Sequence, residues 1–116
     1  MSLYKIFHNP RCSKSRQALQ LLKDNNCKIE IISYLEIDLE VSLIEDILKK
    51  LALKPRDILR KGEQEYKDNN LKKDNLSEED LINYMIKYPK LIERPIVVKG
   101  DKAVIGRPPE NVLELI

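Results

Sequence analysis

The first 34 residues carry a strand–helix–strand pattern, and this pattern constrains the fold more than any other feature of the sequence. The apolar-rich run Leu3–Phe7 predicts a strand that ends at the turn-forming pair Asn9-Pro10. After Cys12, Ser13 and Ser15 can cap a predicted helix that Asn25-Asn26 ends. Its apolar positions, which fall on one side, are Ala18, Leu19, Leu21 and Leu22. Lys28–Tyr34 then predicts a second, largely buried strand. Two strands joined by one helix within about thirty residues should lie parallel, with a right-handed crossover.

The middle of the chain has a helical pattern instead, from about residue 36 to residue 90. Apolar residues recur at helical spacing between Leu43 and Leu51. Pro55 suits the first turn of a short helix. Ser77 followed by three acidic residues predicts another helix start, and Pro89 predicts its end. The mostly polar stretch from Lys67 to Asn75 is expected to be the exposed loop of this region.

The last part of the chain returns to strands. Ile96–Val98 and Lys102–Ile105 flank a Lys-Gly-Asp turn, which predicts a hairpin, and an amphipathic turn follows up to Ile116. The order is therefore βαβ, a helical insertion at about 36–90, then ββα. We expect a single α/β domain over residues 1–116 with a thioredoxin-like fold and a mixed four-stranded sheet. The alternative, a flavodoxin-like parallel sheet, needs further βα repeats where this chain has a hairpin.

Charge and composition exclude several classes of function. The 21 basic and 19 acidic residues are interleaved, with a net charge of +2, so no basic face for general nucleic-acid binding is expected. No apolar run approaches the roughly 18 residues of a membrane span, and no signal segment opens the sequence, so we expect a cytoplasmic protein. In that compartment its two cysteines should be free thiols. The sequence has no metal-ligand spacing, so no metal site is predicted.

Cys12 has the surroundings of a reactive thiolate. It follows a strand and a proline turn and directly precedes a helix, whose first backbone N–H groups would point toward its sulfur. Ser13 and Ser15 add hydroxyl donors. A cysteine that only packs in a core needs apolar neighbours, and this one has almost none. The nearby groups that are or can become positive are His8, Arg11, Lys14 and Arg16.

The rest of this loop excludes two related kinds of thiol chemistry. A phosphatase loop places its arginine six residues after the cysteine, where this chain has Ala18, and Arg16 is therefore expected to be solvated or ion-paired. A thioredoxin-type pair is absent because Ser15 stands where the second cysteine would be. Cys27 should lie at the opposite end of the helix and is interpreted as structural. A lone thiol cannot close its own disulfide, so turnover would need an external thiol such as glutathione.

Four separated motifs resemble those of the arsenate reductase (ArsC) family. They are "HNPRCSKSR", "ILRKGE", "LIERPIVV" and "AVIGRPPE", and they occur in the family's order. The resemblance runs from Tyr4 to Leu115 and points to the glutathione- and glutaredoxin-coupled, thioredoxin-like branch. The "RCSKSR" form is most similar to the YfgD-like members.

The resemblance implies roles for particular residues. Cys12 matches the family's nucleophile and His8 the histidine before it, while Pro95 matches the cis proline beside the thiol. The residues that match oxyanion-binding positions are Arg60, Arg94 and Arg107, and Ser15 is a further candidate for substrate binding. The implied reaction is attack of the thiolate on arsenate, followed by addition of glutathione and release of arsenite with the help of glutaredoxin. No bound cofactor is implied, and we expect a monomer.

Antiparallel pairing in the predicted hairpin supports part of this assignment. Arg94 precedes its first strand and Arg107 follows its second, so both arginines should meet at one end. Planar guanidinium groups suit a tetrahedral oxyanion. The chain departs from the usual pattern of the family at Ser13-Lys14, where arsenate reductases of the family more typically carry Gly-Thr.

The sequence alone leaves two other functions open. One is an Spx-like regulator that binds RNA polymerase, a class that usually carries a CxxC switch. The other is a general glutathione-linked thiol oxidoreductase, which would use Cys12 but depend less on the arginines.

Overall fold

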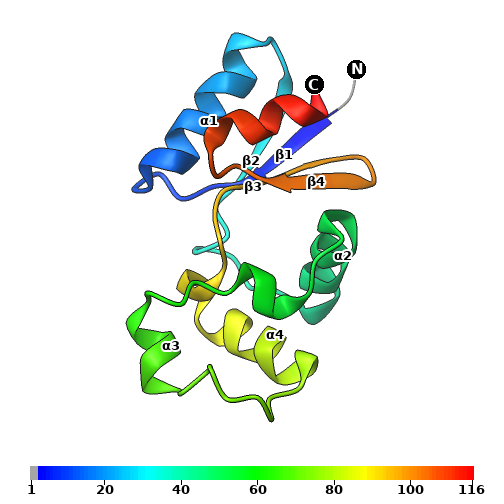
Figure 1. Ribbon diagram of the computed structural model, residues 1–116. Coiled ribbons are helices and arrows are strands. Elements are labelled where there is room, and N and C mark those ends of the chain that lie inside the picture. Colours follow the sequence, from blue (N-terminus) through cyan, green and yellow to red (C-terminus); the bar gives the residue numbers. More distant parts are fainter. Residues whose placement is uncertain (1–2) are drawn as a thin grey trace. The chain divides into compact units, whose positions relative to one another are not determined.

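The computed structural model describes residues 3–116, which form two compact units (Figure 1). The sheet unit comprises the described residues up to Ile37 together with Arg94–Ile116, and the helical unit comprises Asp38–Glu93. Along the chain, the elements are β1 (Leu3–Phe7), α1 (Ser13–Asp24), β2 (Lys28–Ile32), α2 (Val41–Leu51), η1 (Pro55–Ile58), α3 (Gln64–Asp68), α4 (Glu78–Lys87), η2 (Pro89–Leu91), β3 (Ile96–Lys99), β4 (Lys102–Ile105) and η3 (Pro109–Leu115), where η marks a 3-10 helix.

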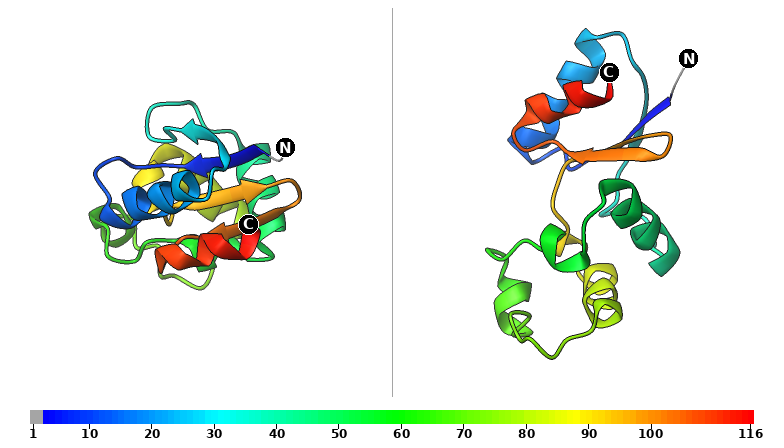
Figure 2. Two further views of the ribbon diagram at one scale, coloured as in Figure 1. Left: turned by 90° about the horizontal axis from the view of Figure 1, so that it is seen from above. Right: turned by 45° about the vertical axis from the view of Figure 1, so that its right-hand side comes forward.

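The sheet unit contains the predicted mixed four-stranded sheet, in the order β2-β1-β3-β4. β1 pairs with β2 in parallel and with β3 in antiparallel orientation, and β3 pairs with β4 as a hairpin. The crossover helix α1 and the C-terminal η3 lie side by side on one face of the sheet (Figure 2). The last element is a 3-10 helix, but it occupies the place of the final helix in the predicted ββα order.

An aliphatic core joins this face of the sheet to α1 and η3. Its buried members are Tyr4, Ile6, Ala18, Leu22, Val97, Val112 and Leu115. Gly106, directly after β4, lies close to Pro95, Ala18 and Val112, and a Cβ placed on it would be 2.8 Å from Pro95 Cγ. The end of the hairpin therefore packs against α1 without room for a side chain at position 106.

The prediction that the second strand is largely buried was wrong. In β2, no residue is fully buried, and Ile31 is 49% exposed. The reason is its place in the sheet: β2 is an edge strand that pairs only with β1. An apolar run of this kind cannot by itself distinguish an edge strand from a central one.

Two elements of the helical unit begin at the residues that the sequence indicates, whereas α3 was not predicted. Pro55 is the first residue of η1, and Ser77 caps α4. The Ser77 hydroxyl accepts a hydrogen bond from the Asp80 N–H at 3.1 Å, while the Asp80 carboxylate accepts one from the Ser77 N–H at 3.0 Å. This reciprocal pair is a capping box, which satisfies two backbone donors that the helix itself leaves open. Pro89 follows the end of α4, as predicted.

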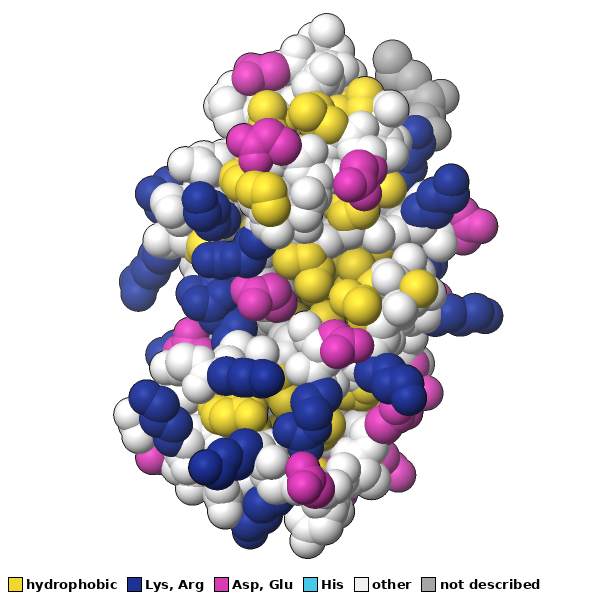
Figure 3. All heavy atoms as spheres, in the orientation of Figure 1, with side chains coloured by type: hydrophobic (Ala, Val, Ile, Leu, Met, Phe, Trp, Pro, Cys, Tyr) yellow, Lys and Arg dark blue, Asp and Glu magenta, His cyan; other side chains and the backbone are white. Residues whose placement is uncertain are grey.

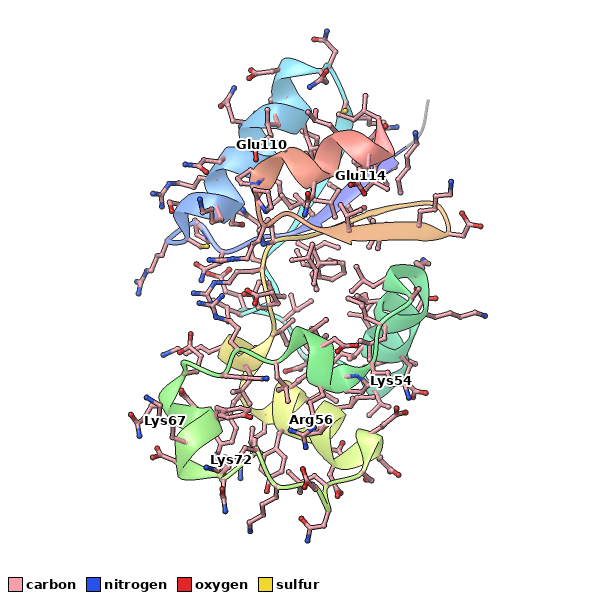
Figure 4. The ribbon with its side chains drawn as sticks, in the orientation of Figure 1. Lys54, Arg56, Lys67, Lys72, Glu110 and Glu114 are labelled. Atoms are coloured by element: carbon pink, nitrogen blue, oxygen red, sulfur yellow. The ribbon has the colours of Figure 1, made fainter. Side chains whose placement is uncertain are left out.

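The stretch from Lys67 to Asn75 is only partly the exposed loop that its polarity predicts. Its first two residues end α3, and Leu71 is fully buried. Arg56 fixes the segment, because its guanidinium donates to the Leu71 carbonyl and to the Lys73 carbonyl, both at 2.8 Å (Figure 4). Of the remaining positions, Asn69 is half-buried, whereas Asn70 and positions 72–75 are exposed. Within residues 3–116, no helix is both long and apolar enough to cross a membrane.

Candidate active site

Cys12 lies at the junction that the sequence predicts, as the N-cap residue of α1. Its backbone N–H donates to the Asn9 carbonyl at 3.0 Å, and its carbonyl accepts from the Arg16 N–H at 3.0 Å. Asn9 also accepts the Arg11 N–H through its side chain, at 3.0 Å. The asparagine thus folds the loop back on itself, which is a common role for Asn before a proline turn. These bonds fix the backbone that carries the thiol.

The surroundings of Cys12 stabilise its thiolate. Burial raises the pKa of the thiol, but the backbone N–H of Ser15, the side chain of Arg94 and the backbone N–H of Lys14 together lower it by more, and the charge of Arg94 acts in the same direction. The net result is a pKa below that of an ordinary cysteine. Partial exposure together with a lowered pKa is characteristic of reactive cysteines rather than of packing ones.

The hairpin brings Arg94 and Arg107 together, as the sequence predicts. The Gly106 N–H donates to the Pro95 carbonyl at 2.9 Å and extends the pairing by one step beyond β3 and β4. An Nη1 atom of Arg107 lies 3.4 Å from the Arg94 carbonyl oxygen, to which it donates. The Arg94–Pro95 peptide bond is cis, as the resemblance implies, and so is the bond between Arg107 and Pro108. Two guanidinium groups therefore belong to the same end of the sheet unit as Cys12.

Figure 3 shows further cationic side chains over the N-terminal end of α1. Arg11 and Arg16 are exposed and Lys14 is half-buried, while the first acidic residue of the helix is Asp24 in its last turn. Arg16 donates to the Pro10 carbonyl at 2.8 Å and remains exposed, so it tethers the loop rather than closing a cradle around an anion. The start of α1 is thus positive through both its side chains and its helix dipole.

His8 and Ser15 form a buried pair beneath the thiol loop. His8 Nδ1 lies 2.6 Å from Ser15 Oγ, which also accepts the Asn9 N–H at 3.1 Å. The pKa of His8 is lowered, chiefly by burial and also by the positive charges of Arg16 and Lys23. The lowered pKa favours the neutral imidazole, whose Nδ1 contacts the Ser15 hydroxyl.

This pairing changes the part that Ser15 can take in binding a substrate. Its side chain is fully buried, and its hydroxyl is engaged by His8 and Asn9. The group that Ser15 offers to Cys12 is its backbone N–H. The sequence does not show that the Ser15 hydroxyl is buried, and so it could not distinguish substrate binding by this hydroxyl from thiolate stabilisation by the Ser15 N–H.

Arg60 belongs to the helical unit, where two carboxylates surround it. Its Nε lies 3.2 Å from a Glu63 oxygen and its Nη1 lies 2.7 Å from a Glu93 oxygen. Its backbone N–H donates to the Leu91 carbonyl at 2.7 Å. Neither glutamate was predicted as a partner of Arg60, although the spacing of three residues between Arg60 and Glu63 is a usual signal for such a pair.

Cys27 is a free, half-buried thiol that follows the other end of α1. α1 has 12 residues, so it separates the two cysteines by about 18 Å at 1.5 Å per residue. A disulfide needs Cα atoms within about 7 Å, so Cys12 and Cys27 cannot pair within this fold. No cluster of three or more potential metal-ligating side chains occurs among the described residues.

A sequence model of the ArsC family matches residues 7–115 of this chain. The chain belongs to the ArsC family. Within that family it is 51% identical to the uncharacterized protein YfgD of Escherichia coli (strain K12) over 97% of this chain and 95% of that one. It is 43% identical to an arsenate reductase of Neisseria meningitidis, with 93% of each chain covered. A solved structure of an arsenate reductase from Vibrio cholerae superimposes with a TM-score of 0.96, at 42% identity over 99% of this chain and 98% of that one.

Proposed function

We propose that this ArsC-family protein is a thiol-dependent oxidoreductase that reduces arsenate to arsenite, with Cys12 as its nucleophile. The observation that carries the proposal is the Cys12 sulfur itself, half-buried at the start of α1, with two backbone N–H groups and Arg94 favouring its thiolate. The arsenate reductases to which the chain is similar support the choice of substrate.

In the proposed reaction, the Cys12 thiolate attacks the arsenic atom, and one arsenate hydroxyl takes up a proton from solvent and leaves as water. This step forms a sulfur–arsenic bond without any change in oxidation state. Two external thiols then supply two electrons that reduce arsenic(V) to arsenic(III); they leave joined as a disulfide, and a second arsenate oxygen leaves as water. Water finally cleaves the sulfur–arsenic bond, which releases arsenite and regenerates the Cys12 thiolate. We propose glutathione and a glutaredoxin as the source of those thiols, because the chain has no second cysteine within reach of Cys12.

The proposed oxyanion site uses guanidinium groups. Arg94 has two tasks: it stabilises the thiolate before the reaction and can bind an arsenate oxygen afterwards. Arg107 adds a second permanent charge at the same end of the sheet unit. Bidentate guanidinium–oxyanion pairs are strong and geometrically specific. Arg60 is proposed to bind the oxyanion only because it matches the family motif; within the helical unit, its ion pairs with Glu63 and Glu93 would compete with an anion.

The test is arsenite formation by the purified protein with glutathione and glutaredoxin supplied. We expect turnover by the native protein, its loss in Cys12→Ser and its retention in the matched control Cys27→Ser. Mass spectrometry of the native protein with arsenate should show an adduct on Cys12.

Two results would contradict the proposal. One is equal loss of turnover in both cysteine variants. The other is reduction of glutathione mixed disulfides, unaffected by Arg107→Gln, with no arsenite formed. That second result would instead indicate a general thiol oxidoreductase.

A further inference from the structure

A groove in the helical unit has no part in the proposed reaction. It has a volume of about 630 Å³ and lies between α2, α4 and the segment that joins α2 to η1. Pockets that hold ligands in proteins usually measure about 300–1,000 Å³, so this one can accept a few side chains but not a whole helix. The lining residues are Val41, Glu45, Leu48, Leu53, Lys54, Pro55, Glu78, Glu79 and Ile82, all within the helical unit.

The floor of the groove is apolar. Leu48 on α2 and Ile82 on α4 are 6% and 5% exposed, and Pro55 is buried between them in the chain. Val41 and Leu48 are seven residues apart on α2, so they share one face of that helix. Leu53 is 38% exposed at the edge of this floor. The groove therefore leaves apolar surface in contact with water.

The rim of the groove is acidic. Glu45, Glu78 and Glu79 are all exposed, and none forms an ion pair with another described residue. By contrast, Asp46, the next residue after Glu45, pairs with Lys50 at 2.8 Å. The rim thus presents three carboxylates without a positive partner.

The rim also contains one cation, Lys54, and lies next to one further acidic residue, Asp80. Lys54, labelled in Figure 4, comes from the segment between α2 and η1 and leaves the lining residues with a net charge of −2. Asp80 is also acidic, but its carboxylate is engaged in the capping box of α4. The charge available to a bound molecule is therefore that of the three glutamates, only partly offset by Lys54.

We propose that this groove docks a short segment of a partner protein that presents aliphatic side chains flanked by Lys or Arg. The aliphatic side chains would cover Leu53 and the floor, and removal of this apolar surface from water would favour binding. The flanking cations would reach the three glutamates of the rim. This combination of an apolar groove and a charged rim is the usual arrangement for recognition of an amphipathic peptide. The proposal does not depend on the function of Cys12.

The test uses three fluorescent peptide probes of equal length. The first combines Leu and Lys, the second replaces every Lys by Glu, and the third replaces every Leu by Ser. Fluorescence anisotropy with the full chain should show binding of the first probe only. Amide NMR shifts should change at the lining residues of the groove and not at the start of α1.

Charge-reversal variants identify the site. Glu45→Lys combined with Glu79→Lys should weaken binding about tenfold or more, since each exposed ion pair is worth up to about a fivefold change. The matched control is Glu110→Lys combined with Glu114→Lys, which makes the same change in net charge on η3, where both residues are exposed (Figure 4). All four positions are exposed, so the variants should fold, and circular dichroism checks this. Leu53→Ser provides a second, uncharged variant that should also weaken binding.

The proposal would be overturned if the Leu-Lys probe bound no more tightly than the probe with Glu or the probe with Ser, or did not bind up to about 1 mM. It would also be overturned if the control pair weakened binding as much as Glu45→Lys with Glu79→Lys, or if the NMR changes centred on α1. A concentration-dependent dimer that Glu45→Lys with Glu79→Lys abolishes would show that a second copy of this chain occupies the groove, and would overturn the assignment to a partner segment.

Discussion

Replacement of Gly106 by alanine should destabilise the sheet unit through one contact. The added Cβ would lie 2.8 Å from Pro95 Cγ, 3.3 Å from Ala18 Cβ and 3.4 Å from Val112 Cγ1. Ordinary contact begins at 3.4 Å, so the proline ring must move by about 0.6 Å relative to position 106. The added Cβ is fixed to the backbone and Pro95 Cγ belongs to a closed ring, so neither atom can move away by a side-chain rotation.

The size of the effect follows from two opposing terms. Extra methyl groups in a packed interior cost about 1–3 kcal/mol, whereas Gly→Ala stabilises by about 0.4–1 kcal/mol through the unfolded chain. We therefore expect Gly106→Ala to lower the free energy of unfolding by about 1–2 kcal/mol. For a chain of this length, that corresponds to a fall in Tm of about 4–8 °C.

Pro95 directly follows Arg94, so the same substitution should also affect the thiol. Movement of the proline would displace the arginine whose side chain stabilises the Cys12 thiolate. We expect a raised Cys12 pKa and slower alkylation of Cys12 at neutral pH.

Urea unfolding and iodoacetamide alkylation measure the two effects on one sample. Gly62→Ala is the matched control, because a Cβ at that position would have no atom within 4 Å beyond its own residue and its two chain neighbours. The effect of this control on stability should stay within about 0.5 kcal/mol. A Gly106→Ala protein as stable as the Gly62→Ala protein would refute the reasoning about packing. Lost stability with unchanged alkylation would refute the link from Pro95 to the thiol.

Three further predictions concern hydrogen bonds and pH. Ser15→Ala should cost about 2 kcal/mol or more in urea unfolding, because it leaves the buried His8 ring and the Asn9 N–H without their partner; an unchanged midpoint would contradict this. Ser77→Ala should cost about 1 kcal/mol by the same measurement, since it removes the cap of α4, and Ser77→Asp should restore most of that. The lowered pKa of His8 means that the unfolded chain binds a proton that the folded chain does not, so stability should fall as the pH drops below about 6.5; a flat profile down to about pH 5 would exclude it.

Features of the fold that depend on local sequence were predictable. The capping box at Ser77 spans four residues, and the β3–β4 hairpin turns at Gly100, whose φ of +61° suits glycine. The position of Cys12 at a helix start also follows from its immediate neighbours. In each case, the residues that decide the structure are close together in the chain.

Features of the fold that depend on residues far apart in the chain were not predictable from the sequence. The exposure of β2 results from the order of the strands, which no single strand encodes. The burial of Leu71 depends on Arg56, fifteen residues earlier, whose guanidinium holds the carbonyls of this segment.

The candidate site divides in the same way. The placement of Arg94 and Arg107 at one end of the hairpin followed from antiparallel pairing. The contact between His8 and Ser15 could not be predicted from the sequence. Both residues could equally have faced the thiol, and only their burial shows that they contact each other. The Glu93 partner of Arg60 lies 33 residues away in the chain and carries no local signal.

The central claim is that the fold maintains Cys12 as a thiolate through Arg94 and the start of α1. Its most direct test is the pKa of Cys12, measured by ultraviolet thiolate absorbance in a Cys27→Ser background, with and without Arg94→Gln. We predict a pKa below that of a free cysteine and a rise when Arg94 is replaced. A pKa equal to that of a free thiol, unchanged by Arg94→Gln, would contradict the account.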